Sequence, residues 1–88
     1  MFKMWAKTFH NTHMIKQTVI TDDRDETRTH KVFDSIDKIC EEFDLSRPIW
    51  LNKNIEDFKH FSKVRFDQDS FIDTIDFDYL EIQMLEED

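Results

Sequence analysis

Glycine is absent from this 88-residue chain, which also has only one proline and one cysteine. Average usage would give a chain of this length roughly six glycines. Phosphate-binding loops, dinucleotide-binding fingerprints and nucleophile elbows all need glycine, because their backbones take positive φ or approach a ligand closely. The composition therefore excludes these three kinds of site. It also predicts that turns are built from Asn, Asp, Ser and Pro48, which fix the backbone through a ring or side-chain hydrogen bonds.

Long apolar runs are missing as well. No segment approaches the roughly 18 apolar residues that can span a bilayer. The first residues, MFKMWAKTFHNTH, lack the apolar segment and the small-residue cleavage site of a signal peptide. Cys40 is the only cysteine, so it has no partner for an internal disulfide. We therefore expect a cytoplasmic protein that does not enter a membrane.

Acidic residues are missing from the first 21 positions and basic residues from the last 22, although the net charge is −8. Residues 1–21 carry three lysines, whereas residues 67–88 carry nine acids. Between them, residues 22–45 carry nine acids and four bases, and residues 46–66 carry five bases and two acids. Because unlike charges attract, we expect the basic first segment to lie beside the acidic last one.

Aromatic residues, in contrast, are abundant at 14% of the chain, and nine of them are phenylalanine. Each aromatic side chain can bury about 150–250 Å², so a single domain over residues 1–88 can form one core. Two segments alternate apolar and polar residues, FKMWAKTF (2–9) and MIKQTVIT (14–21), and the polar HNTH between them suits a hairpin turn. In the second strand we expect Ile15 and Val19 to be covered, together with Met14 or Ile20.

The clearest helical pattern covers residues 30–44. Apolar side chains recur there with helical spacing, at Val32, Phe33, Ile36, Ile39, Cys40 and Phe43. Thr27 or Thr29 can cap the start of this helix. We expect Ser46-Arg47-Pro48 to end it, because the residue before a proline is pushed out of the α region.

A second, shorter helix is expected in the segment SRPIWLNKNIEDFKHFSKVRF, residues 46–66. Asn52 or Asn54 is the expected N-cap. The apolar face of this helix would hold side chains spaced by three, Ile55, Phe58 and Phe61. KVRF (63–66) then alternates as a short strand does.

The last quarter of the chain predicts one helical turn and one strand. Ser70 is the expected cap of the turn, with Asp73 three positions later. DYLEIQML (78–85) alternates, with Leu80, Ile82 and Met84 pointing inward and Tyr79, Glu81, Gln83 and Leu85 pointing outward. The acidic surroundings of this strand suit a place next to the first strand, where Lys3 or Lys7 would lie opposite Glu81.

These elements predict an α+β domain, with an N-terminal hairpin and C-terminal strands in one antiparallel sheet and the helices packed on one face. The expected core consists of Val32, Phe33, Ile36, Ile39, Phe43, Ile55, Phe58, Leu80 and Ile82.

The residues suited to catalysis or metal binding are few. His10 and His13 form an HxxH pair, but a zinc site needs a third and usually a fourth ligand. Cys40 belongs to the apolar stripe of the helix, where burial would raise its pKa and leave it inert. Asp67, Asp69 and Asp73 lack the glycine-centred pattern of an EF-hand loop. We therefore expect no catalytic site, no metal site and no cofactor, and hence no enzyme.

Basic and aromatic residues alternate in residues 46–66, a pattern also found in proteins that bind single-stranded nucleic acid. Here the helical and strand spacing places Phe58, Phe61 and Phe66 in the core instead. The net charge of −8 also opposes contact with phosphate. Direct binding of nucleic acid is therefore the less favoured hypothesis.

Two hypotheses for function remain. In the first, the chain binds a protein partner through residues that lie opposite the core-facing set, namely Trp5, Phe9, Tyr79, Lys3 and Lys7. A homodimer is one form of this hypothesis, because an unpaired strand edge at 14–21 or 63–66 could pair with a second copy. In the alternative, the chain is an acidic mimic of nucleic acid that inhibits a DNA- or RNA-binding enzyme, using Asp67, Asp69, Asp73, Asp76, Asp78, Glu81, Glu86, Glu87 and Asp88.

Overall fold

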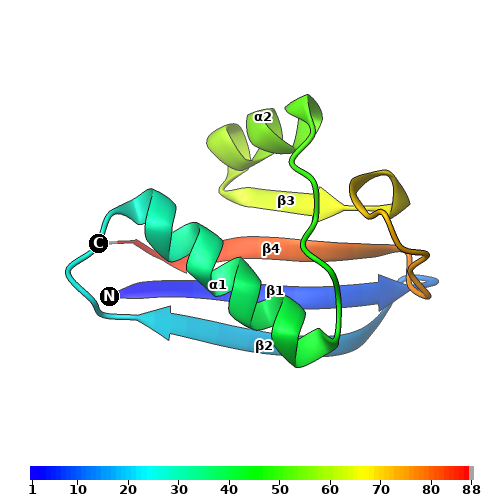
Figure 1. The fold of residues 1–88 in the computed structure, drawn as a ribbon, viewed down its shortest axis with the longest axis horizontal. Helices are drawn as coiled ribbons and strands as arrows, with labels where there is room; N and C mark the ends of the chain where they lie inside the picture. The colour runs from blue at the N-terminus through cyan, green and yellow to red at the C-terminus, as the bar shows by residue number, and fades with distance from the viewer. Residues whose placement is uncertain (88) are drawn as a thin grey trace.

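Four strands form one antiparallel sheet in the computed structural model, which describes residues 1–87 (Figure 1). The strands are β1 (Phe2–His10), β2 (His13–Asp22), β3 (Lys63–Phe66) and β4 (Tyr79–Glu86), arranged in the order β2-β1-β4-β3. The other elements are α1 (Arg28–Phe43), α2 (Asn52–Phe61) and a short 3₁₀ turn, η1 (Gln68–Ser70). The predicted α+β class is confirmed, and so is the pairing of the basic first strand with the acidic last strand.

The turns show how a chain without glycine reverses direction. The β1–β2 hairpin has a two-residue loop in which Asn11 and Thr12 both take positive φ, 50° and 67°. Two positive φ values characterise the type I′ turn, whose twist matches that of the strands. Asp44 and Ser62 take positive φ at the ends of α1 and α2. Asn, Asp and Ser thus replace glycine as predicted, whereas a β-branched residue such as Thr12 is unusual in this conformation.

Helix α1 begins two residues before the predicted range 30–44 and ends one residue before the end of that range. Thr27 is its N-cap, and its side chain accepts a hydrogen bond of 3.2 Å from the His30 N–H. The helix ends at Phe43 because Asp44 adopts the left-handed conformation and the Leu45 N–H donates to the Cys40 carbonyl at 2.8 Å. These are the features of a Schellman motif. The prediction that Ser46-Arg47-Pro48 ends the helix was therefore wrong by a few residues.

Helix α2 is fixed by one buried asparagine. The Asn54 side chain accepts a hydrogen bond from the Leu51 N–H at 2.9 Å and donates to the Arg65 carbonyl of β3 at 3.1 Å. Leu51 itself is the N-cap, so the predicted caps Asn52 and Asn54 were wrong, although Asn54 satisfies the helix start from inside the first turn. Its amide thereby joins α2 to the sheet.

The segment after β3 also differs from the prediction. The turn η1 ends at Ser70 instead of beginning after it, and the Asp67 side chain caps it by accepting from the Asp69 N–H at 3.0 Å. The roles predicted for Ser70 and Asp73 were therefore wrong. Ser70 is instead buried, and its hydroxyl donates to the Asn54 side chain at 3.2 Å.

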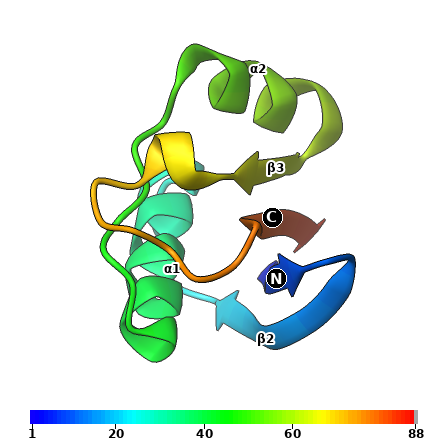
Figure 2. The ribbon, with the colours of Figure 1, turned by 90° about the vertical axis from the view of Figure 1, so that its right-hand side faces the viewer.

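The core lies between α1 and one face of the sheet, and α2 lies beyond β3 at the edge of the sheet (Figures 1 and 2). Its buried apolar residues are Phe2, Met4, Ala6, Val32, Ile36, Ile39, Cys40, Phe43, Phe58, Val64, Phe66, Phe71, Leu80, Ile82 and Met84. Seven of the nine predicted core residues are in this set. Phe33 and Ile55 are exposed, and Phe61, expected on the inner face of α2, is 70% exposed. Because α2 lies at the sheet edge, only Phe58 of its apolar residues reaches the core.

Candidate functional site

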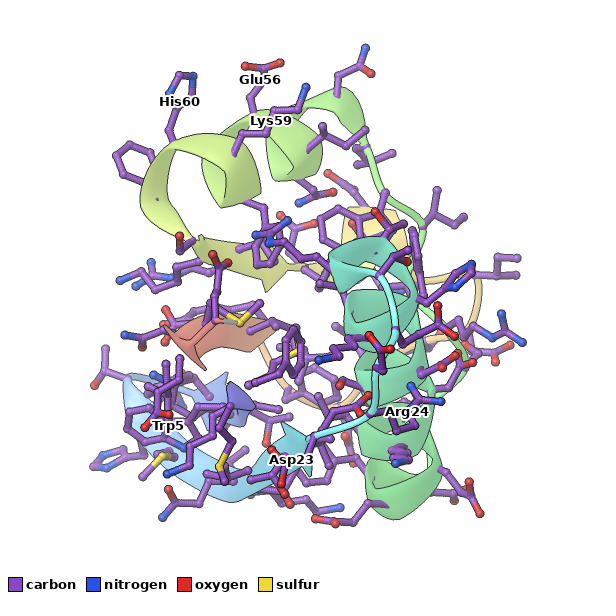
Figure 3. The ribbon with its side chains drawn as sticks, turned by 90° about the vertical axis from the view of Figure 1, so that its left-hand side faces the viewer. Trp5, Asp23, Arg24, Glu56, Lys59 and His60 are labelled. Atoms are coloured by element: carbon purple, nitrogen blue, oxygen red, sulfur yellow. The ribbon has the colours of Figure 1, made fainter. Side chains whose placement is uncertain are left out.

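One face of the sheet carries no helix, and we call it the open face. It is formed by the strand residues that alternate with the core-facing ones, because successive side chains of a strand point to opposite sides. Trp5 lies on the side of the sheet away from α1 (Figure 3). The open face comprises Lys3, Trp5, Lys7 and Phe9 of β1, Gln17 and Val19 of β2, Lys63 and Arg65 of β3, and Tyr79, Glu81 and Gln83 of β4. All five residues predicted to form an interface thus share this one surface.

An ionic row crosses the centre of the open face. Glu81 lies opposite Lys7 of β1 on one side and opposite Arg65 of β3 on the other. The Glu81 carboxylate contacts the Lys7 Nζ at 2.8 Å and the Arg65 Nε at 3.0 Å. Lys7 Nζ also donates to the Gln83 side chain at 3.1 Å. The register of three strands therefore gives one carboxylate two cationic partners, of which sequence reasoning anticipated only Lys7.

Aromatic rings cover both ends of this row. Lys7 Nζ lies 3.7 Å from the centre of the Trp5 ring, and the Arg65 guanidinium lies 4.7 Å from the centre of the Tyr79 ring. Tyr79 in turn stacks on Phe9, with 5.2 Å between the ring centres. Such cation–π contacts strengthen when the cation is desolvated. Although no helix covers this face, Lys7 is only 6% exposed and Glu81 only 4%.

The electrostatics of the row favour the charged form of Glu81. Burial alone raises the pKa of this carboxyl, but the hydrogen bonds from Lys7 and Arg65 outweigh that effect, so the pKa lies below its ordinary value. The Glu81 hydrogen bond likewise raises the pKa of Arg65. The row is therefore charged at neutral pH, and each ion of it has a partner of opposite sign.

Apolar side chains of β2 lie exposed beside the aromatic residues. Val19 is 48% exposed and lies opposite Trp5, while Met14 is 45% exposed and lies opposite Phe9. Ile15 is 53% exposed at the position where the register of the hairpin shifts. The prediction that Ile15 and Val19 are covered was therefore wrong, and only Ile20 is half buried. The reason is the strand order, which makes β2 an edge strand.

The nine residues of the alternative acidic site do not form one surface. Glu81 lies in the ionic row, Glu86 contacts Lys3 at 3.4 Å and Glu87 contacts Arg28 at 2.8 Å. The Asp78 carboxylate accepts from the Asn11 N–H at 2.9 Å, and Asp67 contacts Lys53 at 3.3 Å. Within residues 1–87, only Asp69, Asp73 and Asp76 of this set make no side-chain ion pair or hydrogen bond, and Asp88 lies outside the described residues.

The residues considered for catalysis do not form a catalytic arrangement in the described part of the chain. Burial raises the pKa of the Cys40 thiol to about 11. His10 lies 3.4 Å from Asp78 at the hairpin, and no group of three or more metal-ligating side chains occurs in the part of the chain that the structure describes. A hollow of about 420 Å³ is lined by Lys16, Asp44 and Asp76 among apolar and threonine residues. None of these observations offers a nucleophile with a general base.

A second surface feature is a groove of about 270 Å³ between α1 and α2. Its walls include Phe33, Trp50 and Ile55, and its rim carries Arg28 and Lys59. Phe33 and Ile55, which were predicted to be core residues, are partly exposed because they line this groove. Lys59 points away from the sheet with Glu56 and His60 on the outer side of α2 (Figure 3). Sequence reasoning missed the groove, because its existence depends on where α2 lies.

Among the described residues, neither helix is long and apolar enough to cross a membrane. Comparisons of the chain with protein-family models, with curated proteins and with solved structures found no match.

Proposed function

We propose that this chain is a non-enzymatic cytoplasmic module that binds another protein through its open face. The observation that carries the proposal is the ionic row Lys7–Glu81–Arg65 on a sheet face without a helix, fixed in place by aromatic rings. Trp, Tyr and Arg are the residue types that most often dominate the energy of a protein interface. Here they lie together at the centre of one surface.

Because the ions of the ionic row are already paired, a partner that covers this face loses little charge hydration there. A partner that buries an unpaired charge must compensate for its lost hydration. Lys7 and Glu81 are already buried and paired in the free chain. A partner would therefore remove water mainly from the half-exposed rings of Trp5, Phe9 and Tyr79 and from Val19. This surface fits a partner with an apolar centre and hydrogen-bonding groups at its margin.

An acidic mimic of nucleic acid has less support. Five of its nine acids form ion pairs or hydrogen bonds with neighbouring residues of the chain, and Glu81 is buried. A mimic must instead present free negative charges in the spacing of phosphates. Asp69, Asp73 and Asp76 alone do not provide a long array.

The proposal can be tested by capture of binding proteins on the immobilised chain, over a series of salt concentrations. We expect a partner that binds wild type and remains bound at high salt, since apolar contacts are not screened. Trp5→Ala should lose this partner. The matched control is Phe33→Ala, which removes a 48% exposed aromatic side chain from α1, on the opposite side of the sheet from the open face. Circular dichroism must show that both variants are folded.

The alternative predicts the opposite pattern. A mimic would capture a basic nucleic-acid-binding protein, release it steeply as salt rises, and lose it in the triple variant Asp69→Asn/Asp73→Asn/Asp76→Asn. Capture that survives Trp5→Ala and fails in the triple variant would reject the open face as the binding site.

A further inference from the structure

Strand β2 is the free edge of the sheet. Beyond β3, at the other edge, lies α2, whereas no described element lies beyond β2 (Figure 1). With ten residues β2 is also the longest strand. An uncovered edge strand presents unpaired N–H and C=O groups to which another strand can bind.

The register identifies the groups that point outward. The Met84 N–H donates to the Ser62 carbonyl at 2.8 Å, so the even-numbered residues of β4 bond to the β3 side and the odd-numbered ones to β1. By the same alternation, the even-numbered residues of β1 bond to β2. The N–H and C=O groups of Gln17, Val19 and Thr21 therefore point away from the sheet.

This part of the edge lacks the features that usually block pairing. Lysine, proline and β-bulges commonly protect an edge strand. In β2 the bulge and Lys16 both lie near the hairpin, and residues 17–21 contain none of these features. Val19 instead presents an apolar side chain that is 48% exposed. Residues 17–21 are thus free to accept a strand.

The charges along β2 indicate which kind of strand would pair with its free edge. The hairpin end carries His13 and Lys16, whereas the other end leads into residues 22–26, which contain four acids and one base. In an antiparallel pair of two β2 strands, the basic end of each copy lies beside the acidic end of the other. A second copy of this chain is therefore complementary to the edge at both ends.

Symmetry and charge together select one register. In a two-fold antiparallel pair, one residue must lie opposite itself. With Val19 on the axis, Gln17 lies opposite Thr21 and Lys16 lies opposite Asp22, beside the exposed Asp23. With Ile20 on the axis, Lys16 would face Arg24, and with Thr18 on the axis it would face Ile20. With Thr21 on the axis, Lys16 would face Glu26, but only residues 20–22 of the two strands would overlap. Of the other three arrangements, only the first places Lys16 opposite an acid. Asp22 is itself buried and paired with Arg24, so the exposed Asp23 beside it is the acid that Lys16 can approach.

We propose that two copies of this chain pair antiparallel through β2, with Val19 on the two-fold axis, to form a continuous eight-stranded sheet. On the open face this pairing creates an apolar row of Trp5, Val19 and the same two residues of the second copy. The proposal goes beyond the binding of a different protein and does not depend on it. Because each copy contributes only one strand to the interface, the dimer should dissociate on dilution.

Single cysteines test the register on the full chain. Val19→Cys should form a covalent dimer under mild oxidation, because the two side chains meet at the axis, whereas Cys40 is buried. In this register each copy of residue 17 lies about 14 Å from its equivalent, at about 3.4 Å per residue. Gln17→Cys and Thr21→Cys alone should therefore form no covalent dimer, because a disulfide needs Cα atoms within about 7 Å. An equimolar mixture of the two should cross-link.

Sedimentation equilibrium tests the dimer without cross-linking. Val19→Lys places two like charges on the axis and should shift the chain to monomer, while Ile72→Lys, at an 86% exposed loop position, should dimerise as wild type does. Trp5→Ala should still dimerise even though we expect it to lose the heterologous partner, so the two proposals can fail separately. A wild-type chain that is monomeric at millimolar concentration, or equal cross-linking at positions 17, 19 and 21, would overturn the inference.

Discussion

The two faces of the sheet are built from alternate residues of the same strands and are buried in different ways. On the face towards α1, Phe2, Met4 and Ala6 of β1 are buried against apolar residues of the helix. On the open face, Lys7 of the same strand is nearly as well buried, although no helix covers it. There, the neighbouring side chains of the sheet exclude water from the charge and supply its partners.

This difference separates what stabilises the fold from what shapes the surface. Burial of apolar area contributes roughly 25 cal/mol per Å² and does not depend on exact geometry. A buried ion pair roughly breaks even against apolar residues of the same volume, but it tolerates few arrangements. The apolar face should therefore supply most of the stability. The ionic row should mainly hold Trp5 and Tyr79 in fixed positions.

The largest expected effect comes from the covered face. Ile36→Ala removes a side chain that is 2% exposed in the centre of α1 and should lower the free energy of unfolding by about 2–5 kcal/mol. Urea denaturation followed by circular dichroism measures the change. The control Ile72→Ala, at an 86% exposed position, should change it by less than about 0.5 kcal/mol. Equal effects of the two substitutions would mean that the stripe of α1 is not the core.

On the open face, removing one charge of the Lys7–Glu81 pair should lower the free energy of unfolding, whereas removing both charges should lower it much less. Glu81→Gln leaves Lys7 buried without a counter-ion and should destabilise the chain by about 1–3 kcal/mol. The double variant Lys7→Met/Glu81→Leu replaces the pair by apolar side chains and should recover most of that loss. Chemical denaturation of the three chains is the measurement. A double variant less stable than Glu81→Gln would show that the ion pair stabilises the fold more than apolar side chains do at the same positions.

The arrangement of β1 could be predicted from sequence because it follows from local alternation and from charge. Period-two spacing places Trp5, Lys7 and Phe9 on one side of the strand, whatever the rest of the fold is. The opposite charges of the first and last segments predicted that β1 and β4 are neighbours, and the register places Lys7 opposite Glu81. Both inferences use only pairwise physical rules.

The other site residues depend on the tertiary arrangement. Arg65 reaches Glu81 only because β3 lies on the far side of β4, and a four-residue strand does not specify its neighbour by pattern. Phe33 and Ile55 have the spacing of core residues, yet the position of α2 at the sheet edge leaves them on a groove. The partners of the acidic residues, such as Arg28 for Glu87, are likewise distant in sequence.

Low pH should destabilise the chain through two carboxyl groups, Glu81 and Asp22. The folded chain lowers the pKa of Glu81 through the ionic row, and the side-chain hydrogen bond from Arg24 lowers the pKa of Asp22 from 3.8 to about 2. Because both folded-state values lie below the unfolded ones, their stabilisation is complete above about pH 5 and is lost as the pH falls towards 2. We expect the free energy of unfolding to fall over this window, and Glu81→Gln and Asp22→Asn each to reduce the slope. An unchanged slope in Glu81→Gln would show that the row does not favour the charged carboxylate.

The smallest effect should come from the other lysine–glutamate pair between β1 and β4. Lys3 and Glu86 also lie opposite one another, but their atoms are 3.4 Å apart and their side chains are 36% and 51% exposed. Water screens such a pair, so a double-mutant cycle of Lys3→Met and Glu86→Gln should give a coupling energy of only about 0–0.5 kcal/mol. The same cycle on Lys7 and Glu81 should give a clearly larger value, because these two ions are shielded by the Trp5 ring and by their neighbours. Added salt should weaken the first coupling and leave most of the second. Equal couplings would mean that the aromatic cover of the open face does not exclude water from the row, and the open face would then be an ordinary solvated surface.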